Sequence, residues 1–418
     1  FAFKFTGAYN TSKDVQLRNF TSELNRRTGI KHKVPADWTE AFNLLRDYLD
    51  RPESSEKQVV FLDELPWLDT DGSGFLSSFE WFWNDWASTR SDIVCIVCGS
   101  ATSWMSDHLD DNKGGLFNRH TCRLYLKPWS LYEVELYLKS RNIHWSRYEI
   151  AECYMIMGGI PYYLKHLQRG RSLAQSVDDM FFVKDAPLKK EYDRLFASVF
   201  KNPDKMKAII ECLGTKNAGF TRQEISKLTG ISAGGTLSDD LEALMASDFV
   251  IKYVPFGMGA RDECYKLIDP FCMFYLKFVK GKDSLDNSFW LENLTAQTII
   301  SWRGFAFENV CFNHVRQIKK VLGISGVNTR QSLWSKRADD TDGTQIDMII
   351  ERDDNIINMC EAKFTRNEFI VDKGYHRTLI NRQGLLEKEL SSGKAIHNTL
   401  ITTYGLKYNE YSTFFDNV

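Results

Sequence analysis

The segment Gln58-Val-Val-Phe-Leu-Asp-Glu-Leu-Pro-Trp67 constrains the fold of this chain more than any other. Four apolar residues run directly into two carboxylates, Asp63 and Glu64. A continuous apolar run of this length is typical of a strand buried on both faces of a parallel α/β sheet. Ligands bind such sheets at the carboxyl ends of the strands. Adjacent acids at that edge suit nucleoside triphosphate hydrolysis, with Asp63 holding Mg²⁺ and Glu64 polarising the attacking water. The alternative is a buried strand followed by an ordinary polar turn.

Length and composition set the outer limits. A chain of 418 residues is expected to form two or three domains, and its 43% hydrophobic residues suffice for packed cores. No apolar run approaches the ~18 residues that a membrane helix needs, and no signal peptide is visible. We therefore expect a cytoplasmic protein with no membrane contact. The net charge of −2 argues against a globally basic nucleic-acid binder but leaves a local patch open.

The cysteines give no metal signature. Nine are scattered along the chain, and Cys95 and Cys98 form the one Cys-x-x-Cys pair that invites a zinc or redox interpretation. Both lie in an apolar strand, where positions three apart point to opposite faces. We interpret them as small buried residues.

Strands and helices alternate through residues 1–165. We expect strands at 1–5, 58–64 and 92–102 and helices at 12–24, 38–49 and 79–86. This alternation predicts a parallel sheet with helices on both faces. Ser100, at a strand end, is placed to sense a γ-phosphate or simply ends its strand. Arg119 is either a phosphate contact or a surface arginine.

These segments resemble the archaeal-type AAA-like ATPases, a family of P-loop proteins found in archaea and anaerobic bacteria. The resemblance covers most of the chain and rests on the order and spacing of the strand ending in Asp63-Glu64, Gly99-Ser100, the Arg119 segment leading to Pro128, and Gly158-Gly-Ile-Pro161. It implies ATP and Mg²⁺ as cofactors, with Asp63 as the Walker B metal ligand and Glu64 as the catalytic acid. It also implies that Ser100 lies on the sensor strand and that Gly159 and Pro161 lie near the adenine. Relatives often form rings, so the resemblance allows a homo-oligomer.

One departure from the family is large. The Walker A loop, Gly-x-x-x-x-Gly-Lys-Ser/Thr, occurs nowhere in the 418 residues. The resemblance places Phe1 just after the Walker A helix, so we expect a truncated P-loop core that lacks its first strand and phosphate loop. Without that backbone cradle and its lysine, triphosphate affinity should be poor. The parent protein is therefore expected to bind ATP, and this chain alone is expected not to hydrolyse it.

Residues 166–285 predict a helical lid and a winged helix. Helices at 205–213, 221–229 and 236–245 precede strands at 249–254 and 263–268, the order of a winged helix. The third helix would enter the groove of duplex DNA, or the module is structural or binds another partner. Three acids on that helix would repel phosphate, namely Asp239, Asp240 and Glu242. Basic residues on neighbouring elements could offset them, namely Lys205, Lys207, Lys216, Arg222 and Lys227. We expect residues 281–287 to be a linker.

Residues 286–418 predict an α/β domain with a cluster of charged residues. We expect a helix over 302–318, on which Glu308 shares one stripe with apolar residues such as Phe305 and Phe312. A carboxylate there costs free energy unless it is paired or binds metal. Asp347 lies on a strand over 345–350, and Glu361 and Lys363 project from one face of the next strand, so the three side chains can converge. A helix over 373–389 follows, with Gln383 as an additional polar contact.

This constellation resembles the restriction-endonuclease-like nucleases with the PD-(D/E)xK pattern. The resemblance implies that Asp347, Glu361 and Glu308 bind one or two Mg²⁺ and that Lys363 orients or deprotonates the attacking water. The alternative is a degenerate nuclease fold whose acids form a structural salt bridge with Lys363.

The sequence as a whole predicts a truncated P-loop ATPase core (1–165), a helical lid with a winged helix (166–285) and a restriction-endonuclease-like domain (286–418). The first functional hypothesis is an ATP-dependent protein that acts on nucleic acid, with a metal-dependent deoxyribonuclease site. The second is a non-cleaving switch in which ATP controls DNA or protein binding. A decayed family member with neither activity is the third.

Overall fold

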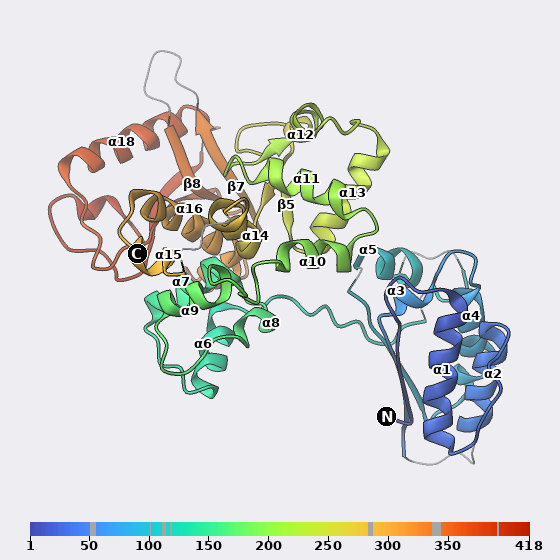
Figure 1. Ribbon diagram of the computed structural model, residues 1–418. Helices are drawn as coiled ribbons and strands as arrows, with labels where there is room; N and C mark the ends of the chain where they lie inside the picture. The colour runs from blue at the N-terminus through green and yellow to red at the C-terminus, as the bar shows by residue number, and fades with distance from the viewer. Residues whose placement is uncertain are drawn as a thin grey trace. The chain divides into compact units, whose positions relative to one another are not determined.

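The computed structural model describes residues 1–50, 56–100, 102–110, 114–117, 119–282, 287–336, 344–390 and 393–418 (Figure 1). Contacts divide the chain into two compact units, one made of residues 1–125 with 197–201, and the other of residues 126–196 with 202–418. The second unit thus begins well before residue 166. The division into three domains stays a prediction.

The first unit is built on a three-stranded parallel sheet. Its strands β1 (Phe3–Thr6), β2 (Gln58–Asp63) and β3 (Ile93–Val97) have the order β1-β2-β3. Thr6 pairs with Asp63 and Leu62 with Val97, so the three strands end at the same edge. This confirms the expected parallel α/β sheet and makes the acid-ending strand its centre.

Helices cover one face of this sheet. The principal helices are α1 (Lys13–Thr28), α2 (Trp38–Leu49) and α4 (Phe75–Asp85), with shorter turns at α3 (Leu65–Leu68), α5 (Thr102–Met105), Ala87–Thr89 and Ser106–Asp110. Phe3, Phe5, Val60 and Leu62 are buried in one core with α1, α2 and α4. Helix α2 begins where it does because the Asp37 side chain accepts a hydrogen bond from Glu40 N.

The opposite face of the sheet carries Lys4, Phe61 and Ile96. Ile96 is 42% exposed, Phe1 stacks on Phe61 with ring centroids 5.4 Å apart, and the Lys4 amine lies over the Phe61 ring. Among the described residues, helices therefore cover one face, whereas the sequence predicted helices on both. The missing layer leaves apolar side chains on a surface that a parallel sheet ordinarily buries.

The second unit begins with helices and continues into a small antiparallel sheet. The first helices are α6 (Leu131–Ser140), α7 (Arg147–Met157), α8 (Pro161–Leu164), α9 (Leu173–Phe181) and α10 (Glu191–Val199), of which residues 197–199 count with the first unit. We call residues 203–267 the helix–hairpin module. It contains α11 (Pro203–Leu213), β4 (Phe220–Thr221), α12 (Arg222–Thr229), α13 (Gly235–Ala246), β5 (Val250–Tyr253), a turn at Ala260–Asp262 and β6 (Cys264–Leu267), and its sheet order is β4-β6-β5.

A four-stranded sheet forms the last part of the unit. After α14 (Pro270–Phe274), a helical turn at Tyr275–Val279 and α15 (Phe289–Glu292), the elements are α16 (Gln297–Asn313), α17 (Val315–Val321), β7 (Thr329–Lys336), β8 (Thr344–Arg352), β9 (Ile356–Lys363), α18 (Lys373–Glu387), β10 (Ala395–Thr402) and a turn at Ser412–Phe414. The sheet order is β10-β9-β8-β7, with β10 parallel to β9 and the other pairs antiparallel. Residues 283–286 of the expected linker lie outside the described residues.

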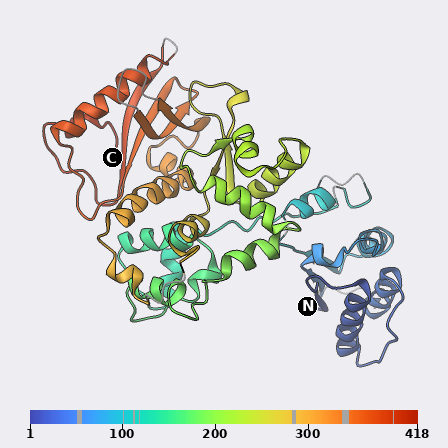
Figure 2. The ribbon, with the colours of Figure 1, turned by 45° about the horizontal axis from the view of Figure 1, so that its top comes forward.

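Helices α16 and α18 pack against opposite faces of this sheet (Figures 1 and 2). Met348 and Ile350 point to Phe312 of α16, and the alternate residues Ile349 and Met359 pack with Leu386 of α18. The period of two along each strand thus divides the core into two layers. On the α16 face, that layer also includes Tyr253 of the helix–hairpin module, so the module and the sheet share a core.

Buried polar contacts join the early helices of the second unit to its last part. Arg303 of α16 donates from Nη2 and Nε to Glu152 Oε1 of α7 at 2.6 and 2.8 Å, and both side chains are about 95% buried, with exposures of 7% and 5%. The Asp178 carboxylate accepts from the backbone N–H groups of Trp290 and Leu291. These contacts fix residues 126–196 against residues 287–418. No helix among the described ranges is long and apolar enough to cross a membrane.

Replacing Glu152 by Gln should destabilise the protein by about 3–5 kcal/mol, because it leaves the Arg303 guanidinium buried without a counter-charge. Chemical denaturation followed by circular dichroism measures the loss. The control is Asp179→Asn, which breaks the exposed Arg171–Asp179 pair and should cost at most about 1 kcal/mol. Equal effects of the two substitutions would contradict the role assigned to the buried pair.

Candidate functional site

Three strand ends bring polar side chains together in the first unit. The Asp63 carboxylate, at the end of β2, accepts a hydrogen bond from Thr6 Oγ1 at 3.1 Å and one from Cys98 Sγ at 2.8 Å. Thr6 ends β1 and Cys98 follows β3. We call these residues, with Glu64 and Ser100, the carboxylate edge.

Glu64 is held across the end of β3. Its backbone adopts a left-handed conformation with φ of +52°, which turns the chain out of the strand. Its Oε2 atom accepts from Ser100 N at 3.2 Å and Ser100 Oγ at 2.9 Å. Gly99 is required beside it, because a Cβ atom there would lie 2.5 Å from Pro66 Cδ. The structure therefore brings together Asp63, Glu64 and Ser100, as their shared strand edge predicts.

Thr6 and Cys98 are site residues that sequence reasoning missed. Burial, and then the hydrogen bond to Asp63, raises the pKa of the Cys98 thiol to about 11, so the thiol donates a hydrogen bond to the carboxylate. Cys95 packs against the apolar core, and burial raises its pKa to about 12. Both side chains are half-buried: Cys95 packs against the core, as expected of a small apolar residue, whereas Cys98 also bonds to Asp63. Parallel-strand register offered the signal, because Cys98 directly follows the strand beside β2.

The carboxylate edge fits a magnesium ion. Mg²⁺ binds proteins through one or two carboxylates and completes its octahedron with waters and phosphate oxygens. Asp63 and the Thr6 hydroxyl are oxygen donors that already lie side by side, and both side chains are at least partly accessible.

The remaining predicted nucleotide contacts are divided between the two units. Arg119 is exposed in the first unit, and its Nε lies 3.4 Å from Gly115 O. Gly159 and Pro161 belong to the second unit. A Cβ atom at Gly159 would lie 1.9 Å from Trp129 O, and Pro161 opens α8, so packing accounts for both residues. Their contacts with a nucleotide stay predictions.

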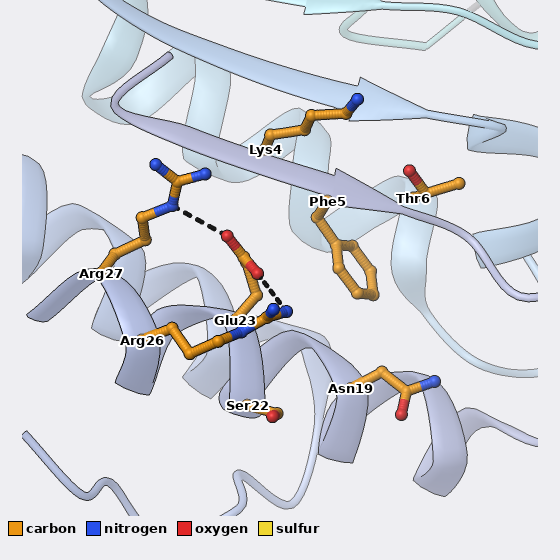
Figure 3. Close-up of a pocket in the computed structure, with 8 residues that line it drawn as sticks. All are labelled: Lys4, Phe5, Thr6, Asn19, Ser22, Glu23, Arg26 and Arg27. Carbon is orange, nitrogen blue, oxygen red and sulfur yellow. Dashed lines mark hydrogen bonds and ion pairs between the residues drawn. The ribbon is translucent and has the colours of Figure 1, made fainter. Parts of the chain in front are cut away.

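A hollow of about 490 Å³ lies beside the sheet, between β1 and α1 (Figure 3). Arg26 and Arg27 of α1 both pair with Glu23, and Lys4 extends away from that group. Its lining residues are Lys4, Phe5, Thr6, Asn19, Ser22, Glu23, Arg26 and Arg27. The two arginines share one carboxylate, so together with Lys4 they leave the lining with a net positive charge.

The second unit contains a buried acid–base cluster, which we define as Glu308, Asp347, Glu361, Lys363 and Arg382. Lys363 Nζ lies 3.2 Å from Glu361 Oε2 and 3.7 Å from Asp347 Oδ2. Met348 pairs with Cys360 across the two strands, which sets Asp347 beside Glu361 at the next position. The predicted convergence of these three side chains on β8 and β9 is present, while their catalytic and metal-binding roles stay predictions.

Every oxygen of Glu361 is engaged by protein groups. Oε1 accepts from Arg382 Nη1 at 2.6 Å, and Oε2 accepts from Tyr375 OH at 2.7 Å and from Lys363. The side chain has no exposed surface. Arg382 and Tyr375, both on α18, are further residues that sequence reasoning missed. Gln383 accepts from Asn398 Nδ2 at 3.0 Å and contacts a neighbouring strand rather than the cluster acids.

Electrostatics in the cluster reflect burial and repulsion. Burial, then Glu361, raises the pKa of Asp347 to about 6, although Lys363 opposes the shift. Burial alone would lower the pKa of Lys363, but Glu361 and Asp347 raise it above its ordinary value. Burial, and then Asp347, raises the pKa of Glu308 to about 8.

Glu308 is bound to the helix–hairpin module. Its Oε2 atom accepts from Asn217 Nδ2 at 2.8 Å, and Asn217 Oδ1 accepts from Lys266 Nζ at 2.8 Å. Lys266 is 2% exposed, and burial lowers its pKa to about 8. A residue outside the predicted domain therefore holds the helix acid of the predicted metal site.

In this arrangement the acid–base cluster does not fit a divalent cation. Within the described ranges, no three His, Cys, Asp or Glu side chains lie close enough to share a metal. A cation at Glu361 would have to displace Arg382, Lys363 or Tyr375. The cluster as seen matches the alternative interpretation, in which the acids pair with Lys363.

Comparison with known proteins places the chain in no family. It matches no family model and no curated protein. Among solved structures it is similar to a Walker-type ATPase of Pyrococcus abyssi, with 15% identity and a TM-score of 0.41 over 63% of this chain and 79% of that one. A similarity this distant shows neither family nor function.

Glu308→Gln should change how stability depends on pH. The raised pKa means that the folded state holds the Glu308 proton more tightly than the unfolded chain, whose value lies near 4.5. The stability from this group is fully present below that value and falls as pH rises toward 8. Glutamine keeps an acceptor for Asn217 and does not ionise.

Denaturation at a series of pH values between 4.5 and 8.5 measures the effect. With rising pH, the wild type should lose on the order of 1 kcal/mol or more relative to Glu308→Gln. The exposed control Glu242→Gln should follow the wild type. Parallel curves for wild type and Glu308→Gln would contradict the assignment.

Proposed function

We propose that the chain is part of an ATP-dependent protein of the P-loop type, with Mg²⁺ bound at Asp63 and the attacking water polarised by Glu64. The observation that carries the proposal is the carboxylate edge: two adjacent acids at the end of a central parallel strand, with Thr6, Cys98 and Ser100 from the flanking strand ends. Bound Mg²⁺ would neutralise phosphate charge. Ser100 holds Glu64 by two hydrogen bonds and would fix the direction of its carboxylate.

The open parts of the first unit support this proposal. Among the described residues, β3 pairs only with β2, and Ile96 on β3 is 42% exposed. A further strand could pair with β3, and a helix could cover Phe61 and Ile96. We propose that a phosphate loop with its strand and helix, supplied by the parent protein, completes the sheet there. That protein would work in the cytoplasm.

Phosphate release from MgATP tests the nucleotide site. The 418-residue chain should show no measurable turnover, because no Gly-Lys phosphate loop is present in its sequence. In a parent protein that carries the loop, Glu64→Gln should lower turnover by about 10²–10⁴-fold while ATP binding persists. Asp69→Asn, which changes a nearby acid outside the edge, is the matched control. Turnover by the 418-residue chain, or full activity of Glu64→Gln, would sink the proposal.

We further propose that residues 286–418 form a restriction-endonuclease-like fold in a non-cleaving, closed state. Order and topology support the fold: a helix, three antiparallel strands, a second helix and a strand parallel to the third. The occupied oxygens of Glu361 favour the non-cleaving switch over the active nuclease. ATP acting on the first unit would control the partner interactions of the second.

The same proposal treats the helix–hairpin module as a winged helix. Its third helix, α13, presents exposed Asp239 and Glu242, which repel a phosphate backbone. Lys205, expected to offset these acids, pairs with the buried Asp240, and Lys207 pairs with Asp193 and Asp204. We therefore favour a protein partner over duplex DNA at α13.

Incubation with plasmid, linear and single-stranded DNA in Mg²⁺ or Mn²⁺ tests the closed state. Wild type and Asp347→Ala should both leave the DNA intact, because the Glu361 carboxylate is already saturated by protein donors. Metal-dependent cutting by the wild type that disappears in Asp347→Ala would establish a nuclease and reject the non-cleaving proposal.

A further inference from the structure

The turn that carries Asn217 is held in place by several bonds within the helix–hairpin module. Lys266 Nζ donates to both the backbone and side-chain oxygens of Asn217, and Tyr253 OH donates to Ala218 O at 2.6 Å. Gly219 follows with φ of +75°, and a Cβ atom there would lie 2.0 Å from Tyr265 O. These bonds and the close packing at Gly219 restrict the conformation of the turn. The module therefore sets the position of the Asn217 amide.

That amide reaches out of the module. Asn217 Nδ2 donates to Glu308 Oε2 at 2.8 Å, on a helix that the sequence assigns to another domain. Lys266 adds a buried positive charge, close enough to Glu308 to oppose the rise of its pKa. On the α16 face, Tyr253 packs in the same core as Phe312 and Met348, so the module cannot move independently of the sheet without opening that core.

Glu308 and Asp347 therefore have different protein partners. Glu308 faces an amide donor and an ammonium group, both supplied by the module, while Asp347 accepts from Ala362 N at 2.9 Å and faces Lys363. The acid carried by the helix and the acid carried by the strand each have their own protein partners. A divalent cation shared by Glu308 and Asp347 would need a free oxygen on each of the two carboxylates.

We propose that Asn217 and Lys266 form a latch through which the helix–hairpin module keeps the acid–base cluster closed to divalent cations. This inference rests on the proposed closed state and explains what keeps the cluster in that state. Asn217 is a positioning residue, since it acts through Glu308. Lys266 holds Asn217 in place and adds a positive charge that repels a metal ion. A partner that displaces the 217–219 turn would release Glu308 toward Asp347.

Mn²⁺ binding, measured by isothermal titration calorimetry and by the loss of the free-Mn²⁺ electron paramagnetic resonance signal, tests the latch without any nuclease assay. Asn217→Ala removes the amide, and Lys266→Met removes the charge but keeps the length of the side chain. Each should raise Mn²⁺ affinity at least about tenfold over the wild type, and adding Asp347→Asn should abolish the gain. The matched control is Asn202→Ala, an exposed asparagine directly before the module whose side chain makes no capping bond.

The outcomes separate the latch from the closed state. A gain that depends on Asp347 in either latch variant supports the latch. Equal Asp347-dependent binding by wild type and variants overturns both the latch and the closed state, and leaves a metal-dependent cluster. Absence of binding in every protein overturns the latch but leaves the cluster as a non-cleaving structural network. Thermal unfolding of each variant shows that it is folded, and the two latch variants make the test independent of either one failing to fold.

Discussion

A buried carboxylate in the second unit cannot remain without partners, and much of that unit follows from this constraint. Glu361 lies on β9 with no exposed surface and would be very costly as an unpaired ion. Arg382 and Tyr375 of α18 and Lys363 of the same strand supply its hydrogen bonds. To reach Glu361 with both side chains, α18 must lie over the sheet with Arg382 and Tyr375 beside β9. Because the partners also surround Asp347, the same requirement determines the electrostatics of the whole cluster.

Local sequence patterns predicted the regular elements well where one signal dominated. Helix α2 has the predicted bounds, 38–49, since Asp37 caps an amphipathic segment with no competing signal. Strand β9 runs over 356–363, and Glu361 and Lys363 share a face as the period of two requires. The predicted helix over 302–318 divides at His314, and Phe305, assigned to the apolar stripe, is 48% exposed. The spacing of apolar residues along a helix shows neither where the helix breaks nor which of those residues another element covers.

The candidate sites were predictable only in part. Asp63 and Glu64 were found because they follow an apolar strand, and Ser100 because it ends the next one. Thr6 and Cys98 join them through strand register, which no short segment encodes. Asn217 bonds to Glu308 across 91 positions of sequence, and Lys266 bonds to Asn217 across 49. Both lie beside a core shared by two predicted domains. Long-range packing, rather than any motif, determined whether the acids were open or occupied.

The one-sided sheet of the first unit has a consequence for how that unit exists in a cell. Among the described residues, no helix covers the face that carries Phe61 and Ile96, and no strand pairs with the outer side of β3. Such an edge can add a strand from any chain that presents one, including another copy of itself. The sheet of the first unit can therefore accept an additional strand beside β3. A strand that pairs with β3 would therefore also change how much of this apolar face meets water.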